Sequence, residues 1–201
     1  MTRSRRNIPI LRGPRRPDRT NERSEAILHK ILISACLLGE PVRYDGNGKL
    51  LRDAQIEVWQ RQGRLVPFCP EVEGGLGTPR PPAEVVGGSG RDVLAGRATV
   101  RTVAGDDVAA AFRLGAQRAV DLVRRAGIRI AILKARSPSC GNEEVYDGSH
   151  QRRLVPGVGV AAAALQQAGV RLFHEGQVEA AAGHLRELQE AEQEAPETPR
   201  H

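Results

Sequence analysis

Between about residues 30 and 175, short apolar runs alternate with longer segments of helical period, and this alternation restricts the fold more than any other feature. The apolar runs have the length and composition of buried strands: 31–36, 65–69, 128–133 and 170–173. The segments of helical period are 51–62, 106–126 and 157–168. Strands that alternate with helices form parallel sheets covered on both faces. We therefore expect a single α/β domain with a mostly parallel, Rossmann-like sheet flanked by helices.

Residues 70–91 do not fit this alternation. They are rich in Gly and Pro, which predicts a long loop over the surface. We expect residues 97–103 to form a small strand that pairs with the segment just before it.

The two ends of the chain differ in charge. The first thirty residues hold nine Lys or Arg against three Asp or Glu, whereas residues 175–201 hold two against seven. We interpret 1–28 as a basic, disordered arm and 176–201 as a Glu/Ala-rich C-terminal tail, which leaves 29–175 as the folded domain. The arm could bind RNA, but a solvated extension is favoured.

The apolar runs are all short. None reaches the roughly 18 residues that a membrane span needs. The N-terminal region also lacks the apolar stretch of a secretory signal. We expect a cytoplasmic protein with no membrane partner.

Cys36, Cys69 and Cys140 each follow a predicted strand. An odd number of cysteines without an export signal argues against a disulfide framework. Their spacing, C-x32-C-x70-C, matches no zinc-finger or ferredoxin pattern. Because ligands of open α/β sheets bind where parallel strands end, we expect the three thiols to converge there. This favours a metal or cluster site over three unrelated core thiols.

Three thiolates would leave one coordination position open. A zinc site with three cysteine ligands, completed by water or a carboxylate, meets this description. So does an iron–sulfur cluster with one open iron. The residues alone do not decide between the two.

Polar residues surround each cysteine. Glu71 lies two residues after Cys69, where a carboxylate can stand beside a metal and act as a general base, although it could instead pair with Arg80. The remaining candidates are Ser137 and Ser139 before Cys140, and Tyr44 and Asp45 in the loop after Cys36. Each could equally be a turn or packing residue. Their clustering around the thiols favours a functional role for Glu71 and Ser137.

Four stretches that contain these residues carry a further signal: LISACLLGEPVRYDG, PFCPEVEGGLGTPRPPAE, KARSPSCGNEEVYDG and LVPGVGVAAAAL. Together they resemble the TudS thiouracil desulfidase family, long catalogued as a domain of unknown function. The resemblance covers about residues 30–175, in order, with all three cysteines in place.

The resemblance implies a [4Fe-4S] cluster held by Cys36, Cys69 and Cys140, with one iron free to take the sulfur of a substrate. It also implies hydrolytic, non-redox cleavage of the C–S bond of thiouracil or a related thiolated pyrimidine, with release of sulfide. Glu71 would activate the water, and Ser137 would bind substrate and relay protons. Tyr44, Asp45 and Ser139 are weaker candidates for substrate binding.

Two alternatives remain beside this prediction. A relative of these enzymes acts on thiolated tRNA, usually with an additional domain, and the resemblance therefore leaves a tRNA desulfidase open. A non-catalytic module that binds zinc through the three cysteines is the other alternative. We favour a free thiolated base or nucleoside as the substrate.

Overall fold

A computed structural model describes residues 28–194 of the chain. The basic arm predicted for 1–28 therefore lies, apart from its last residue, outside the described residues, as do the last seven residues of the predicted tail. None of the helices between residues 28 and 194 is long and apolar enough to cross a bilayer.

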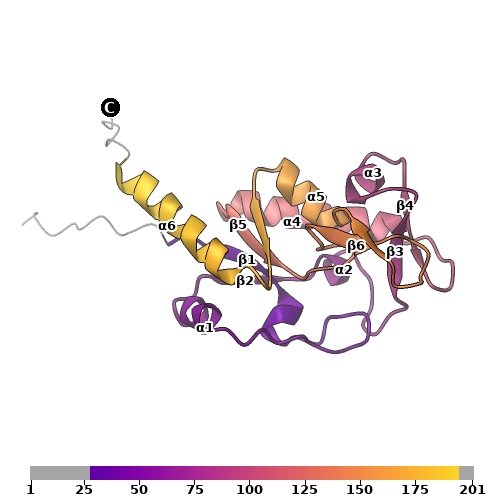
Figure 1. Cartoon of the computed structure of the whole chain (residues 1–201), viewed down its shortest axis with the longest axis horizontal. Helices are drawn as coiled ribbons and strands as arrows, with labels where there is room; N and C mark the ends of the chain where they lie inside the picture. The colour runs from indigo at the N-terminus through magenta and orange to yellow at the C-terminus, as the bar shows by residue number, and fades with distance from the viewer. Residues whose placement is uncertain (1–27, 195–201) are drawn as a thin grey trace, which may run out of the picture.

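The centre of the molecule is a four-stranded parallel sheet (Figure 1). Its strands are β1 (Ile31–Ser34), β2 (Leu65–Phe68), β5 (Ile130–Leu133) and β8 (Arg171–His174), in the order β2-β1-β5-β8. The chain first moves from β1 to β2 and then crosses back to β5, so the direction of winding reverses between β1 and β5. In sheets of this kind the ligand crevice lies outside the carboxyl ends of the strands at that reversal.

Helices cover both faces of the sheet, as expected for parallel strands (Figure 1). Successive β1 side chains alternate between the faces, since Ile31 and Ile33 belong to one core cluster and Leu32 to the other. The first face packs against α1 (Ala54–Arg61) and α6 (Val178–Glu194). The second face packs against α4 (Ala109–Arg125) and α5 (Val160–Gln167). The predicted fold class is confirmed.

A third core cluster extends the domain beyond the sheet. It joins α4 and α5 to α3 (Gly90–Leu94) and to an antiparallel pair formed by β3 (Ala83–Val86) and β4 (Thr99–Thr102). Strand β4 thus pairs with the segment before it, as predicted for 97–103. Residues 70–91 are more regular than the predicted loop, because they contain β3 and the short helix α2 (Pro70–Glu73).

A second antiparallel pair was not expected from the sequence. It consists of β6 (Glu144–Tyr146) and β7 (Leu154–Pro156). Helix α6 is the described part of the predicted tail, and it buries Val178, Ala181, Ala182 and Leu185 against the sheet. The boundary drawn at residue 175 therefore falls between β8 and a helix that shares its core.

Candidate functional site

The three cysteines lie at the carboxyl edge of the sheet. Cys36 lies in the 3-10 helix η2 (Ala35–Leu38), directly after β1. Cys69 directly follows β2, and Cys140 lies in the loop after β5. Because β2, β1 and β5 are neighbours in the sheet, the chain delivers the three residues to one edge from three separate elements.

The thiols are close enough to influence one another electrostatically. Burial, together with a smaller contribution from the neighbouring Cys69, raises the pKa of Cys36 to about 11. Burial also raises the pKa of Cys140, with smaller contributions from Cys69 and Cys36 and an opposing hydrogen bond with Ser34. The pKa of Cys69 is raised by burial as well. These thiols are therefore protonated at neutral pH.

A single metal ion and a cluster make different demands on three cysteines. A zinc ion holds every thiolate at about 2.3 Å from one centre, whereas a cluster distributes its thiolates over separate irons. Within residues 28–194, no group of three or more His, Cys, Asp or Glu side chains is arranged to hold a metal ion.

Glu71 is held by an arginine beside Cys69. Both Nε and Nη2 of Arg80 donate to Oε2 of Glu71, at 2.9 and 2.7 Å, and both side chains are largely buried. The same guanidinium donates to the carbonyl oxygen of Val42 at 3.0 Å, which also accepts the Cys69 thiol at 3.8 Å. The pairing of Glu71 with Arg80, an alternative that the sequence left open, is therefore present. It fixes one oxygen of Glu71 and leaves the other free of the arginine.

That second oxygen faces Ser137. The Ser137 hydroxyl donates to Oε1 of Glu71 at 3.4 Å, which joins the two predicted catalytic residues across 66 positions of sequence. The same hydroxyl accepts the backbone N–H groups of Ser139 and Cys140, each at 3.1 Å. Ser137 thus acts as a turn residue and a partner of Glu71 at once.

The loop that carries Cys140 is fixed by the start of α5. The N–H groups of Val160 and Ala162 donate to the carbonyl oxygens of Pro138 and Ser139, at 2.9 and 3.0 Å. Gly159 allows this close approach, because a Cβ there would lie 2.5 Å from the Ser139 backbone. The loop also begins with Arg136 at φ 62°, a left-handed conformation that costs a non-glycine residue about 1 kcal/mol.

The predicted substrate-binding residues occupy different environments. Tyr44 and Asp45 are exposed, and Asp45 pairs with Arg43 at 3.2 Å and accepts the Asn47 N–H at 3.1 Å. The Tyr44 carbonyl accepts the Arg80 N–H at 2.8 Å, which ties this loop to the Glu71 side of the site. Ser139 is fully buried, and its hydroxyl has no hydrogen-bond partner among the described residues. Substrate binding by these three residues remains a prediction.

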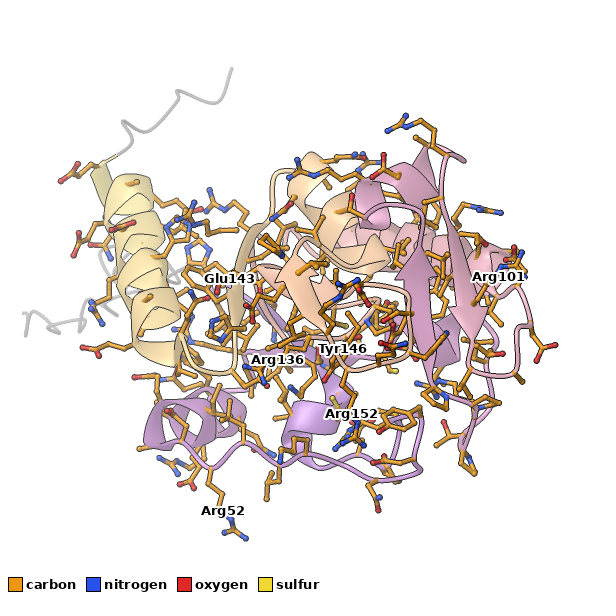
Figure 2. All side chains as sticks on the ribbon, turned by 45° about the vertical axis from the view of Figure 1, so that its right-hand side comes forward. Arg52, Arg101, Arg136, Glu143, Tyr146 and Arg152 are labelled. Atoms are coloured by element: carbon orange, nitrogen blue, oxygen red, sulfur yellow. The ribbon has the colours of Figure 1, made fainter. Side chains whose placement is uncertain are left out.

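The β6–β7 pair borders the Cys140 loop. Gly157 and Gly159 donate to the carbonyl oxygens of Glu143 and Gly141, at 2.9 and 2.7 Å. Arg136, Tyr146 and Arg152 lie over the middle of the molecule, whereas Arg52 and Arg101 project from its periphery (Figure 2). The residues that flank β6 and β7 are thus hydrogen-bonded to one another directly after Cys140.

Two polar residues at this edge were not singled out from the sequence. Lys134 directly follows β5 and Glu175 directly follows β8, and their side chains form an ion pair. The rule that selected the cysteines, a chemically competent residue where a parallel strand ends, applies to both and could have found them.

Comparisons with known proteins agree with this arrangement. The sequence model of the family described as 2-thiouracil desulfurase matches residues 31–177. The uncharacterized protein YbbK of Bacillus subtilis (strain 168) is 39% identical over 148 residues, which cover 74% of this chain and 97% of YbbK. A solved structure described as the [4Fe-4S]-dependent thiouracil desulfidase TudS is 42% identical, with a TM-score of 0.72, and the match covers 79% of this chain and 98% of that one.

The match spans the whole parallel sheet and contains all three cysteines, Glu71 and Ser137. The resemblance noted in the sequence is confirmed, and the chain belongs to the 2-thiouracil desulfurase family.

Proposed function

We propose that this chain hydrolyses the C–S bond of thiouracil or a related thiolated pyrimidine without a net redox change, and releases sulfide. The proposed cofactor is a [4Fe-4S] cluster on Cys36, Cys69 and Cys140. The observation that carries the proposal is the contact between Glu71 and Ser137 beside these thiols. This contact supports the proposal because it joins a carboxylate and a hydroxyl, two groups that can exchange protons with a substrate.

The donor set fits such a cluster. Thiolates are the usual ligands of iron–sulfur centres, and three of them leave one iron without a protein ligand. The cysteines come from separate strand ends, and the Cys140 loop is held by backbone hydrogen bonds to α5. The Ser139 hydroxyl, buried beside Cys140 and unpartnered among residues 28–194, is a polar atom that a bound group could satisfy.

When bound, the cluster would supply a Lewis-acidic iron with high affinity for the sulfur of the substrate. The residues of the chain would then activate the attacking water and transfer its protons. Oε1 of Glu71 would accept a proton from the water that attacks the ring carbon. Arg80 would keep that carboxylate in position through its two hydrogen bonds to Oε2.

Ser137 would provide the second polar contact. Its hydroxyl is oriented by the two N–H groups that donate to it, so its own hydrogen is directed away from the turn and toward Glu71. From this position it can donate its hydrogen to the substrate, and Glu71 itself then returns the proton that it has taken to the leaving sulfide. Bond cleavage consumes one water, gives the oxo-pyrimidine and sulfide, and requires no electron.

The direct test is an anaerobic assay of reconstituted protein. Iron and acid-labile sulfide are quantified, and 2-thiouracil, 4-thiouracil and their nucleosides are each followed by loss of thiocarbonyl absorbance and by sulfide release. We expect a brown protein with about four irons per chain that converts at least one of these compounds. A colourless protein with stoichiometric zinc would contradict the proposal and favour the zinc-binding module. Activity on thiolated tRNA alone would reassign the substrate.

A further inference from the structure

Lys134 and Glu175 are adjacent at the carboxyl edge of the sheet, and the proposed reaction does not use them. The last registered pair of β5 and β8 is Leu133 with His174, so the two residues leave the sheet side by side. The Lys134 ammonium pairs with Oε1 of Glu175. Each side chain is about one quarter exposed, at 23% and 24%.

This pair is fixed at several further points. Oε2 of Glu175 accepts the N–H of Ala135 at 2.7 Å, and the Lys134 ammonium donates to the Ala135 carbonyl at 3.0 Å. The Lys134 N–H donates to the hydroxyl of Ser34, at 2.9 Å, and Ser34 is the last residue of β1. The ends of β1, β5 and β8 are therefore joined in one network, from which the loop to Ser137 and Cys140 departs.

The network also places charge beside a cysteine. Ser34, which accepts the Lys134 N–H, ends β1 and lies two residues before Cys36. Burial alone would raise the pKa of Glu175, but hydrogen bonds from Lys134 and from the Ala135 N–H lower it. The Glu175 carboxylate therefore stays ionised beside Lys134, which follows β5 next to the end of β1 that leads into Cys36.

We propose that Glu175 and Lys134 form a positioning pair for the cluster, an inference that rests on the proposed function. Glu175 anchors the start of the Cys140 loop through the Ala135 N–H and holds the ammonium group of Lys134, whose backbone is bonded to Ser34 just before Cys36. A thiolate ligand is an anion in a largely buried site, and a neighbouring cation stabilises it. Partners of this kind behind the ligands commonly decide how firmly a metal centre is held.

The pair predicts opposite electrostatic effects for its two members. Adding an electron to a cluster is favoured by a nearby positive charge and opposed by a nearby negative one. Replacing Lys134 with a neutral residue should therefore make the reduction potential more negative. Replacing Glu175 with Gln should make it less negative, while Lys134 remains. Either change loosens the Cys140 loop and should accelerate loss of iron.

The experiment uses reconstituted full-length protein carrying Lys134→Met, Lys134→Arg, Glu175→Gln or the control Lys30→Met. Lys30 directly precedes β1, and its ammonium donates to the carbonyl oxygen of Gly63, which precedes β2. Both lie at the opposite edge of the sheet, so replacing Lys30 removes the same charge far from the site. Midpoint potentials come from redox titration followed by electron paramagnetic resonance, and iron release is timed with an anaerobic chelator. Neither readout depends on turnover.

We expect Lys134→Met and Glu175→Gln to release iron roughly 10-fold faster than the wild type, with potentials shifted in opposite directions. Lys134→Arg and Lys30→Met should stay near the wild-type values. A Lys134→Met protein that assembles no cluster, beside a Lys134→Arg protein that does, would support the pair equally. Identical potentials and release rates for Lys134→Met and Lys30→Met would overturn it.

The same experiment separates this inference from the function on which it rests. If the wild type holds a cluster and desulfurates thiouracil while the variants are unchanged, the pair alone is refuted. If the wild type takes up no iron, the proposed function fails, and the pair fails with it.

Discussion

The two edges of the parallel sheet differ in what they hold. The amino edge borders a surface hollow of about 440 Å³, lined by residues that include His29, Ile128, Arg129 and Glu192. Contacts of Glu192 with His29 and Arg129 join the starts of β1 and β5 to the end of α6. The carboxyl edge instead gathers three cysteines and an ordered set of acid, base and hydroxyl groups from separate loops.

The candidate site is therefore identified by the chemistry of the residues at the carboxyl edge. The size of the hollow at the amino edge does not identify it. The starts of α2 and α5 lie at the carboxyl edge, and the first N–H groups of α5, which have no partner within the helix, donate to the Cys140 loop. At the amino edge α4 ends in Arg124 and Arg125, where cations complement free carbonyl groups. We therefore expect substitutions at the carboxyl edge to remove activity, and those at the amino edge to change stability alone.

The largest effect is expected from the cysteines themselves. Replacing any one of Cys36, Cys69 and Cys140 with Ala should abolish cluster assembly and with it all turnover, because two thiolates cannot hold the centre at this open site. Bound iron and the brown absorbance measure cluster assembly, and sulfide release measures turnover.

The folded state should survive each of these substitutions. Loss of one sulfur costs about 1 kcal/mol at a buried position, and Cys69 is only half-buried. Urea unfolding of the metal-free proteins checks this cost. An alanine variant that keeps four irons and full activity would remove that cysteine from the site.

Glu71→Gln should give the next largest effect. The amide can still accept hydrogen bonds from Arg80 but cannot take a proton from water, so kcat should fall by roughly 100-fold or more while the cluster remains. Iron content and steady-state rates are measured on the same sample.

Glu73→Gln is the matched control for this change. Glu73 lies on the same short helix, but it is exposed and faces Arg118 at 3.8 Å. Its replacement should leave both iron content and kcat near the wild-type values. If the two variants were equally active, Glu71 would be a structural partner of Arg80 and nothing more.

Helix packing sets the position of Glu71, and a glycine makes that packing close. A Cβ at Gly115 of α4 would lie 1.8 Å from the Pro70 carbonyl oxygen, at the start of α2. Gly115→Ala should therefore force α2 away, cost about 1–3 kcal/mol of unfolding free energy and lower activity through displaced Glu71. Chemical denaturation and steady-state kinetics check the two parts.

Gly183→Ala is the control for this substitution. Gly183 lies within α6, and the nearest atom that its Cβ would meet is the end of the Arg186 side chain, at 3.8 Å. Alanine should stabilise that helix by about 0.5–1 kcal/mol. A Gly115→Ala protein as stable and active as this one would show that α2 tolerates a wider helix separation.

The sequence predicts the central sheet and the pairing of β4 but not the β6–β7 pair, for a physical reason. Strands of the central sheet are buried on both faces, so they appear as continuous apolar runs, as in Ile31–Ser34 and Ile130–Leu133. By contrast, β6 spans only Glu144–Tyr146 and buries one residue, Val145. Such a short edge segment has no periodicity to detect.

The candidate site also contains residues that the sequence predicts and a contact that it does not predict. Cys36, Cys69, Cys140, Glu71 and Ser137 stand in local motifs at strand ends, so the topology rule and the family resemblance both select them. The ion pair between Lys134 and Glu175 joins residues 41 positions apart. A pair of that kind depends on the register of β5 and β8, which the sequence does not state.

The smallest effect is expected at the amino edge, from Glu192→Gln. Oε2 of Glu192 lies 3.1 Å from Nε2 of the buried His29, and Oε1 pairs with Arg129. These partly exposed contacts should contribute about 1 kcal/mol or less, so urea unfolding should reveal a small loss. Glu190→Gln, an exposed change on the same helix, should cost less.

Turnover and iron content should match the wild type in both variants, since the whole length of β1 and β5 separates Glu192 from the cysteines. A fall in kcat with Glu192→Gln would mean that contacts at the amino edge influence turnover at the carboxyl edge. The hollow at the amino edge would then belong to the functional site.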